Sequence, residues 1–472
     1  MPATAAPGST FDVIVIGAGP AGEVIAGRLA KAGKSVALVE RGLVGGECSF
    51  WACMPSKALL RPADALAEVA RVPGAAQAVT GALDVAAALA RRDEVIKHLD
   101  DSGQIPWLED RGVKLIRGHA RLSGERQVRV EDTAYDARDA VVVAVGSAAA
   151  MPPIPGLEES RPWTNREATI TTTIPERLAI LGGGAVGVEL AQAFASLGAR
   201  VTLIEPEDRL LIREEPFAAA EVRAALQERG VDVRVGTRAA RVVREAGGSV
   251  TLTLEGDDGG TVTADDLLVA AGRRPLTDDL GVEVAGLTPG ESIDVDDTLR
   301  VPGAPWLYAV GDVNGRSLLT HAGKYQAHVA AQNILGADAR AAADTGGPPR
   351  VVFTEPQVAA VGIALQAALD AGIRARAVDV PTSGTPGASF HGRNTAGTAR
   401  LVIDEQRGTV VGATFTGTDV AEWLHAATIA IVSEIPVERL WEAIPAFPTR
   451  SEIWLRLLEQ READIAGERR TG

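Results

Sequence analysis

This 472-residue chain has little cysteine, no basic stripe and no long apolar run. Its two cysteines and six dispersed histidines offer no ligand set for a zinc site. The net charge of −15 argues against a nucleic-acid partner, because few basic side chains are available to neutralise phosphates. No stretch reaches the roughly 18 uncharged apolar residues of a membrane span, and residues 1–10 lack the basic start of a signal peptide. We therefore expect a cytoplasmic protein with no nucleic-acid and no membrane partner.

The chain is rich in glycine, with 51 residues, and is otherwise typical of a globular protein, with 46% hydrophobic and 23% charged residues. Abundant glycine indicates tight turns or close backbone contacts with ligands. The length predicts two to four domains. Two proline- and glycine-rich stretches mark the expected boundaries, MPPIPG at 151–156 and GGPP at 346–349. The part after the second boundary reads as an α+β module.

One pattern occurs twice: a buried strand, the glycine spacing G-x-G-x-x-G, a helix and a second strand that ends in glutamate. The first copy contains Gly17, Gly19, Gly22 and Glu40, and the second contains Gly182, Gly184, Gly187 and Glu205. Corresponding positions are 165 residues apart for the first glycine and again for the acid. A single such fingerprint is a weak signal, but two in matching contexts predict two dinucleotide-binding sites.

This spacing has a chemical reason. The first glycine permits a tight turn, the second lets the backbone approach a pyrophosphate, and the third packs the helix against its strand. The acid then lies at the end of the neighbouring strand, within reach of a ribose hydroxyl. Each copy also has a later apolar strand that returns toward the ligand, DAVVVAVGS at 139–147 and DDLLVAAGR at 265–273, the latter containing Gly272.

Both cysteines lie in one short segment, GGECSFWACMPSK, as Cys48 and Cys53. In an ideal helix, residues five apart are separated by about 7.5 Å along the axis, whereas a disulfide needs Cα atoms within about 6.8 Å. The pair can therefore bridge only where the helix is distorted, which Gly45, Gly46 and Pro55 allow. The alternatives to a redox pair are two unrelated buried thiols or half of a zinc site, and the zinc site would need further Cys or His ligands that the chain does not offer at suitable spacing.

The first fingerprint, its acid and GGECSFWACMPSKALL together resemble the class I pyridine nucleotide-disulfide oxidoreductases, which include lipoamide dehydrogenase, glutathione reductase and mercuric reductase. Further motifs follow in the family's order over nearly the whole chain: YAVGD (308–312), LTHAGKYQAH (319–328) and VVFTEPQVAAVG (351–362). The resemblance implies an α/β fold with two Rossmann-like dinucleotide-binding domains and a C-terminal α+β dimerisation domain.

It also implies a domain order and a homodimer. We expect an FAD-binding domain in two parts, 1–150 and 277–346, an NAD(P)-binding domain at 151–276 and a dimerisation domain at 347–472. Gly17, Gly19, Gly22 and Glu40 would hold the adenosine half of FAD. Asp312 would bind the ribityl chain, and Thr320 would contact the flavin through its backbone.

The resemblance further implies that Cys53 lies against the isoalloxazine and that Cys48 is the exposed interchange thiol. Lys57 would lie near flavin N5 and pair with Glu189; the alternative is two solvated helix charges. The second fingerprint with Gly272 would carry the nicotinamide cofactor. Glu205 should repel a 2′-phosphate, which favours NAD over NADP.

Two details bear on that preference. Family members that use NADP place arginines just after this strand, and here those positions are Pro206 and Ile212. Arg209 and Arg213 lie close by in sequence.

The pattern departs from the family near the C-terminus. Disulfide reductases of this family end in His-Pro-Thr-x-Ser-Glu, whereas this chain has Phe447 at the histidine position and keeps Glu452. The histidine would remove a proton from the incoming thiol, which is worth about 10²–10⁴ in rate. The nearest substitute in sequence is His425, on a segment that reads as a packed helix.

Three functions follow from these residues. The first is an enzyme that passes electrons from NADH through FAD and the Cys48–Cys53 disulfide to a small-molecule acceptor that needs little proton transfer. Such an acceptor is a reactive disulfide, a quinone, a metal ion or a carbon electrophile. The second is lipoamide dehydrogenase activity with a substitute base. The third is a flavin-binding redox sensor or subunit with little turnover.

Overall fold

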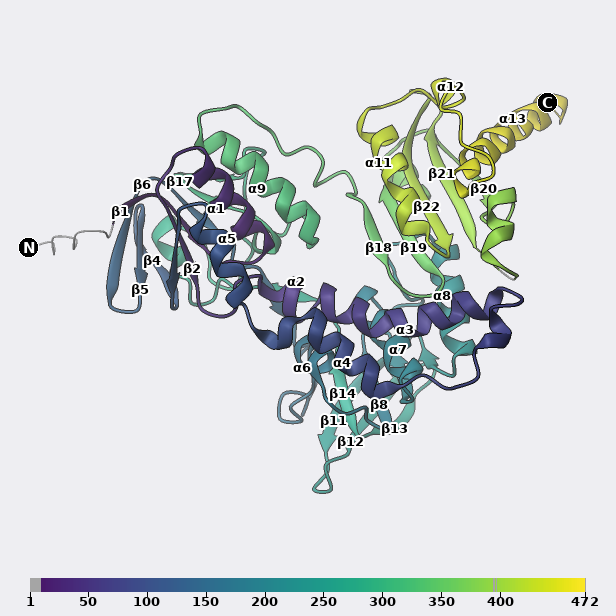
Figure 1. Ribbon diagram of the computed structural model, residues 1–472, viewed down its shortest axis with the longest axis horizontal. Coiled ribbons are helices and arrows are strands. Elements are labelled where there is room, and N and C mark those ends of the chain that lie inside the picture. The colour runs from purple at the N-terminus through teal and green to yellow at the C-terminus, as the bar shows by residue number, and fades with distance from the viewer. Residues whose placement is uncertain (1–9, 394, 396, 472) are drawn as a thin grey trace, which may run out of the picture. The chain divides into compact units, whose positions relative to one another are not determined.

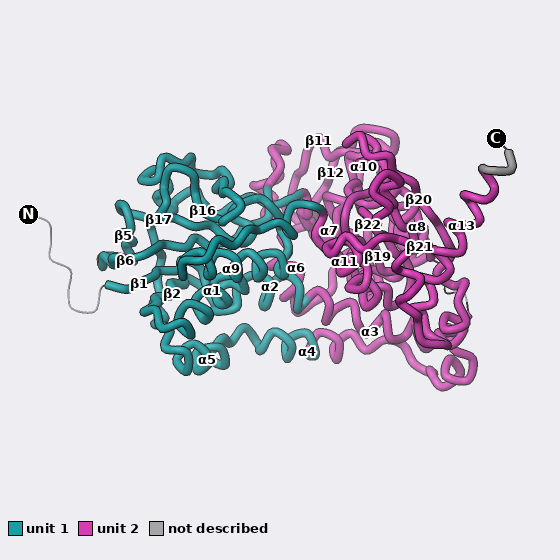
Figure 2. The backbone as a smooth tube through the Cα atoms, turned by 90° about the horizontal axis from the view of Figure 1, so that it is seen from above, with its two compact units in different colours: residues 1–55, 91–150, 272–346 teal, residues 56–90, 151–271, 347–472 magenta. Residues whose placement is uncertain are grey.

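The computed structural model describes residues 10–393, 395 and 397–471. Residues 1–9, which include most of the segment that argued against a signal peptide, lie outside the described residues. Among the helices of the described part, none is both long and apolar enough to cross a membrane. Two compact units divide the chain (Figures 1 and 2). Unit 1 comprises residues 1–55, 91–150 and 272–346, and unit 2 comprises 56–90, 151–271 and 347–472.

Unit 1 is built on a sheet with the strand order β16-β17-β6-β1-β2-β3, which is parallel from β17 to β3. At one edge β16 pairs antiparallel with β17, and the β4–β5 hairpin joins β6 antiparallel. The strands of unit 1 are β1 (Thr10–Ile16), β2 (Val36–Glu40), β3 (Val113–Arg117), β4 (Ala120–Gly124), β5 (Gln127–Val130), β6 (Thr133–Val143), β7 (Ser147–Ala149), β15 (Arg273–Pro275), β16 (Arg300–Val301) and β17 (Ala304–Ala309). Its helices are α1 (Pro20–Lys31), α2 (Gly46–Phe50), α5 (Ile105–Glu109) and α9 (Thr320–Ile334).

Apolar strands such as VIVI in β1 and AVVV in β6 are buried on both faces, as parallel strands require. On one face, α1 and α9 pack side by side over the sheet (Figure 1). The other face packs against the β4–β5 hairpin and the segment 280–293. Two helices cross the division between the units in sequence: α3 (Cys53–Arg71) and α4 (Val85–Val95).

Unit 2 contains a parallel sheet, β10-β9-β8-β14, an antiparallel sheet, β11-β12-β13, and a five-stranded antiparallel sheet, β18-β19-β22-β21-β20. The first two sheets comprise β8 (Arg177–Leu181), β9 (Arg200–Ile204), β10 (Asp232–Arg234), β11 (Thr237–Arg244), β12 (Val250–Gly256), β13 (Gly260–Ala264) and β14 (Asp266–Val269). The third comprises β18 (Arg350–Val352), β19 (Gln357–Gly362), β20 (Ala375–Pro381), β21 (Thr398–Asp404) and β22 (Thr409–Gly417).

The helices of unit 2 are α6 (Asn165–Ile170), α7 (Ala185–Ser196), α8 (Pro216–Glu228), α10 (Leu365–Asp370), α11 (Leu424–Val432), α12 (Val437–Leu440) and α13 (Ile453–Thr471). A core of buried aliphatic residues joins the five-stranded sheet to α11 and to the start of α13. The expected α/β fold with a C-terminal α+β part is confirmed. The two compact units do not correspond one to one to the expected domains, since residues 56–90 and 151–271 group with 347–472. The expected domain limits stay a prediction.

Candidate active site

The first glycine fingerprint forms a tight turn at the end of β1. Gly17 has a φ of +102°, and a Cβ there would lie 2.4 Å from the Ala144 carbonyl oxygen. A Cβ on Gly22 would lie 1.8 Å from the Gly17 oxygen, so the helix packs against its own turn. Gly19 is different, because nothing lies within 4 Å of the Cβ position. The turn therefore leaves open space at the position where a pyrophosphate would approach the backbone.

The acid at the end of β2 is held against this turn. Glu40 accepts hydrogen bonds from the backbone amides of Ala18 (2.7 Å) and Gly42 (2.6 Å). Each carboxylate oxygen thus has one amide donor and keeps acceptor capacity for a hydroxyl group. The open position at Gly19 and the anchored carboxylate fit the adenosine end of FAD.

The second fingerprint repeats this geometry at the end of β8. Gly182 has a φ of +109°, a Cβ on Gly187 would lie 1.9 Å from the Gly182 oxygen, and Gly184 faces open space. Glu205 accepts hydrogen bonds from the amides of Gly183 (2.5 Å) and Glu207 (2.9 Å). These residues fit a second dinucleotide.

Three further residues are linked to the nicotinamide cofactor by their positions in the sequence: Arg209, Arg213 and Gly272. The guanidinium of Arg209 donates to the carbonyl of Ile212 at 3.2 Å, and Arg213 is exposed. Gly272 follows β14 with a φ of +114° and nothing near its Cβ position.

The cysteine segment begins directly on the first fingerprint. The amide of Gly45 donates to the Ala18 carbonyl at 2.8 Å. A Cβ on Gly46 would lie 2.8 Å from the Cα of Gly19, so glycine is needed for this close approach. The segment is not one continuous helix, because α2 ends at Phe50 and α3 begins at Cys53. This break between α2 and α3 is the distortion that a bridge between Cys48 and Cys53 would need.

The two thiols face each other within unit 1. A hydrogen bond to the Cys53 side chain, followed by burial, raises the pKa of the Cys48 thiol well above its usual range. The Cys53 sulfur lies 3.7 Å from the Oγ1 of Thr320, the first residue of α9. The structure therefore joins the cysteine pair and Thr320 at one place, beside the first fingerprint turn.

Asp312 belongs to a polar cluster that the sequence did not reveal. Its Oδ2 accepts from Ser147 Oγ at 2.5 Å and lies 3.7 Å from Arg273 Nε. Arg273 also donates to the Ser147 hydroxyl and carbonyl, both at 2.7 Å, and approaches Glu47 at 4.0 Å. One guanidinium thus lies near both Asp312 and the residue that precedes Cys48.

Lys57 and Glu189 form an ion pair within unit 2. Their Nζ and Oε2 atoms are 2.6 Å apart, and the Glu189 side chain is only 5% exposed. Its other oxygen accepts from the Phe353 amide at 2.9 Å, and the Lys57 ammonium lies 4.8 Å from the centre of the Phe353 ring. The alternative of two solvated helix charges is therefore wrong.

One turn further along α7, the side chain of Gln192 also bridges two other segments of unit 2. Gln192 accepts from the Glu355 amide (2.7 Å) and donates to Asp64 (3.2 Å). Burial and the nearby Glu355 charge raise the pKa of Asp64 to about 7. Sequence reasoning missed Gln192, although it stands three residues after Glu189 on the same face of α7.

The C-terminal motif leaves a carboxylate without its imidazole. Phe447 is 75% exposed, whereas Glu452 is 7% exposed and its Oε2 has no hydrogen-bond partner among the residues described. Next to it, the buried Arg450 donates to the Thr418 carbonyl and stacks 4.2 Å over Trp423. His425 lies on α11, whose inner face is packed, but its own side chain is exposed.

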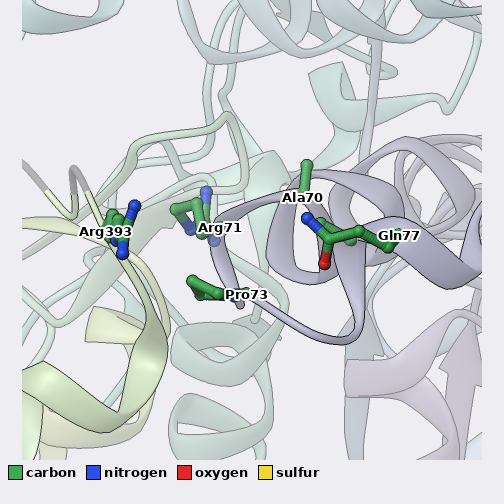
Figure 3. Close-up of a pocket in the computed structure, with 6 residues that line it drawn as sticks. Ala70, Arg71, Pro73, Gln77 and Arg393 are labelled. Atoms are coloured by element: carbon green, nitrogen blue, oxygen red, sulfur yellow. The ribbon is translucent and has the colours of Figure 1, made fainter.

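A cavity of about 320 Å³ opens at the C-terminal end of α3 (Figure 3). Arg71 and Arg393 line it from two segments of unit 2. Arg71 is already paired with Glu355 at 3.0 Å. None of the lining residues is a predicted site residue.

The chain has two glycine turns that fit dinucleotides, and the segment with the two thiols packs on the first turn. These features are those of a flavin-linked disulfide oxidoreductase. Comparison with known families agrees. Residues 11–333 match the family described as pyridine nucleotide-disulphide oxidoreductase, and residues 348–457 match its dimerisation domain. The chain belongs to this family, whose members bind FAD and NAD(P).

Relatives with different names are similar over nearly the whole chain. A dihydrolipoyl dehydrogenase from Thermus scotoductus is 34% identical over 459 residues, covering 96% of this chain and 97% of that protein. A mercuric reductase from Shigella flexneri is 33% identical, covering 93% of this chain and 79% of that protein. Among solved structures, the Cu(II) complex of the HOCl-induced flavoprotein disulfide reductase RclA from Escherichia coli matches with a TM-score of 0.84 at 26% identity, covering 95% of this chain and 99% of that chain.

Proposed function

We propose that this enzyme takes electrons from NADH, passes them through FAD to the Cys48–Cys53 pair, and delivers them to a small acceptor that needs little proton transfer. The observation that carries this proposal is the position of the cysteine segment. Gly45 and Gly46 rest on the first fingerprint turn, and Cys53 contacts the first residue of α9. Bound FAD would supply two-electron transfer between a nicotinamide and a sulfur pair.

The residues around the thiols decide what the acceptor must do. Oxidation of the dithiol to a disulfide releases two electrons and two protons. The raised pKa of Cys48 keeps this thiol protonated. The motif position at which disulfide reductases of the family carry histidine holds Phe447, whose side chain cannot take a proton. A metal ion, a quinone, a reactive disulfide or a carbon electrophile suits such a site better than a thiol substrate that must be deprotonated first.

Two finer assignments belong to the same proposal. The anchored carboxylate of Glu205 would bind a ribose hydroxyl and repel a 2′-phosphate, which supports NAD over NADP. The exposed Phe447 and the match to a dimerisation domain support a homodimer in which the C-terminal motif faces the site of the other subunit.

The second candidate is lipoamide dehydrogenase activity, which the 34% identity to a dihydrolipoyl dehydrogenase favours. It needs a base in place of the missing histidine. Glu452 is not bonded to an imidazole in the described part of the chain, so this candidate depends on a group that the single chain does not bring to Glu452. A redox sensor with little turnover is the third candidate.

Phe447→His provides the test. Because Glu452 is buried with a free oxygen, a histidine at 447 gains a carboxylate that can orient it, and we expect dihydrolipoamide or disulfide turnover to rise about tenfold or more. The measurement is an anaerobic NADH titration followed by two steady-state assays. In the first, NADH is the donor and metal ions, quinones or disulfides are the acceptors; in the second, dihydrolipoamide is the donor and NAD⁺ is the acceptor. Phe390→His is the matched control, since Phe390 is 70% exposed in the same unit.

The outcomes separate the candidates. Equal disulfide turnover in wild type and Phe447→His would mean that the missing base does not limit the enzyme. Fast wild-type turnover with dihydrolipoamide would favour the second candidate. Flavin reduction by NADH without turnover on any acceptor would favour the sensor. A further variant, Cys53→Ser, should keep FAD but lose the long-wavelength charge-transfer absorbance.

A further inference from the structure

Unit 1 carries a second cavity, of about 360 Å³, that no predicted site residue lines. Its lining comes from the segment after α1, the β4–β5 turn, β6, β16, β17 and the end of α9. The charged and hydroxyl side chains that line it are Lys34, Arg126, Arg138, Asp139, Arg300 and Tyr308. Four cations and one carboxylate thus face one cavity in a protein whose net charge is −15.

The cavity is separate from the first fingerprint. Ala140, which lines it, pairs with Val13 in the parallel β1–β6 ladder. Gly17 lies four residues further along the chain, about 13 Å away at strand spacing. This part of the lining therefore lies toward the amino-terminal ends of β1 and β6, whereas the first glycine turn lies at their carboxyl ends. Arg300 and Tyr308 line the cavity from the β16–β17 edge of the sheet, where β6 separates them from β1.

Two of the four cations are neutralised by neighbours. Lys34 pairs with Asp139 and Arg138 with Asp12, each at 2.8 Å. Among the described residues, Arg126 has one ion pair, a long one to Glu125 at 3.9 Å.

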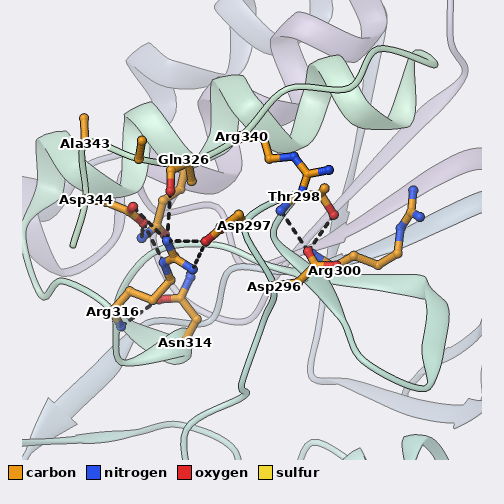
Figure 4. A network of polar contacts seen from close by, with 12 residues as sticks. Asp296, Asp297, Thr298, Arg300, Asn314, Arg316, Gln326, Arg340, Ala343 and Asp344 are labelled. Carbon is orange, nitrogen blue, oxygen red and sulfur yellow. Dashed lines mark hydrogen bonds and ion pairs between the residues drawn. The ribbon is translucent and has the colours of Figure 1, made fainter. Parts of the chain in front are cut away.

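Arg300 forms no ion pair within the described residues. Its guanidinium lies against Tyr308, donating to the hydroxyl at 2.7 and 3.1 Å. Figure 4 shows its side chain extending away from the network of Asp297, Arg316 and Asp344. Two guanidiniums, those of Arg126 and Arg300, thus remain available at the cavity.

We propose that this cavity binds a small oxyanion with two or more negative charges, such as a diphosphate or a polycarboxylate. Guanidinium forks match the paired oxygens of phosphate and carboxylate groups. The Tyr308 ring is buried and lies beneath Arg300, so the cavity offers no aromatic surface for a nucleobase. The ligand is therefore the anionic group itself and not a whole nucleotide.

Isothermal titration calorimetry on the full-length, FAD-loaded protein with saturating NAD⁺ tests the proposal, with inorganic pyrophosphate and citrate as separate probes. We expect one site per chain whose affinity falls as salt rises. Arg300→Gln and Arg126→Gln should each weaken binding about tenfold, and Arg300→Lys should weaken it less. Arg121→Gln, an exposed arginine on β4 outside the lining, is the matched control and should bind as wild type does.

Three results would overturn the site. The first is that neither probe binds, and the second is that the probes bind equally to wild type and to both glutamine variants. The third is binding seen without NAD⁺ that vanishes when NAD⁺ saturates the protein. Arg300→Gln also removes contacts to Tyr308, so its melting temperature is measured without anion. If that temperature falls, Arg126→Gln decides, because Arg126 is exposed on a hairpin turn.

Discussion

The two glycine fingerprints share a backbone and differ in the acid on the helix that follows. Both turns have the same left-handed first glycine, the same contact between third and first glycines, and the same glutamate held by two amides. At the 165-residue offset, however, Glu23 of α1 corresponds to Val188, and Val24 corresponds to Glu189. The carboxylate is thus shifted by one residue, about 100° around the helix. Glu189 is buried, whereas Glu23 is half-buried.

This shift changes what stabilises each acid. Glu189 is paired with Lys57 and accepts from the Phe353 amide. Glu23 has no ion pair within the described residues; burial is the main cause that raises its pKa to about 7, opposed by the charge of Lys324 and reinforced by Glu40. We expect the shared residues to hold the nucleotide, whereas each of the differing acids interacts with the surroundings of its own helix.

The strongest test of the shared part replaces the third glycine in each copy. A Cβ on Gly22 or Gly187 would lie within 2 Å of a carbonyl oxygen that belongs to the turn. We expect Gly22→Ala to retain about a tenth of the FAD or less, and Gly187→Ala to keep FAD but lose about 100-fold in the rate of flavin reduction by NADH. Flavin content and stopped-flow reduction measure both effects.

Gly103→Ala is the control, since Gly103 has open space at its Cβ position. If Gly187→Ala lost FAD while Gly22→Ala kept it, the assignment of the two cofactors would be reversed.

The next test separates the two anchored glutamates. Glu205→Ala removes the charge that opposes a 2′-phosphate, so the ratio of kcat/KM for NADH over NADPH should fall about tenfold or more. Glu40→Ala should lower FAD retention and leave that ratio unchanged. An unaltered ratio in Glu205→Ala would remove the basis for the NAD preference.

Sequence alone predicted what depends on local spacing. The glycine turns, their acids and the cysteine pair each follow from residues within about 30 positions of one another, and the family follows from the order of such short motifs along the chain. The cluster of Arg273, Ser147 and Asp312 did not, because it joins segments that meet only in the folded sheet. Glu23 was missed for a related reason: an acid in the first turn of a helix is usually a solvated partner of the helix dipole, and only the fold shows that it is partly withdrawn from solvent.

The absence of histidine at 447 was readable directly from the motif. That Glu452 is buried with an unpartnered oxygen was not, because burial depends on how η8 (Arg450–Glu452) packs beside Gly387. The roles of the predicted site residues and the cytoplasmic location stay predictions.

We expect a smaller effect when the acid of the second copy, Glu189, loses its paired cation, because Glu23 in the first copy has no ion pair among the described residues. Lys57→Met would leave Glu189 buried without a cation. Removing one partner of a buried pair costs about 3–5 kcal/mol, and we expect about 2 kcal/mol here because Lys57 is one-third exposed. Chemical denaturation of the FAD-loaded protein measures this cost.

The double variant Lys57→Met/Glu189→Leu is the matched control and should recover much of the loss, since no unpaired carboxylate remains. Equal stability of Lys57→Met and wild type would show that the ion pair contributes nothing to the fold.

Glu23→Gln should give the smallest effect, and its sign depends on pH. Between pH 4.5 and about 7 the folded protein keeps a proton on Glu23 that the unfolded chain has lost. The contribution of this group to stability is therefore fully present below about pH 4.5 and is lost as pH rises through 7. Glutamine cannot ionise, so the variant should melt about 2 °C or more above wild type at pH 8 and show no such difference at pH 5.

Glu228→Gln, at the C-terminal end of α8 in the second copy, controls for the loss of one negative charge. A difference that is equal at both pH values would mean that Glu23 is ionised in the folded protein, and the contrast between the two helices would then reduce to the ion pair of Glu189 alone.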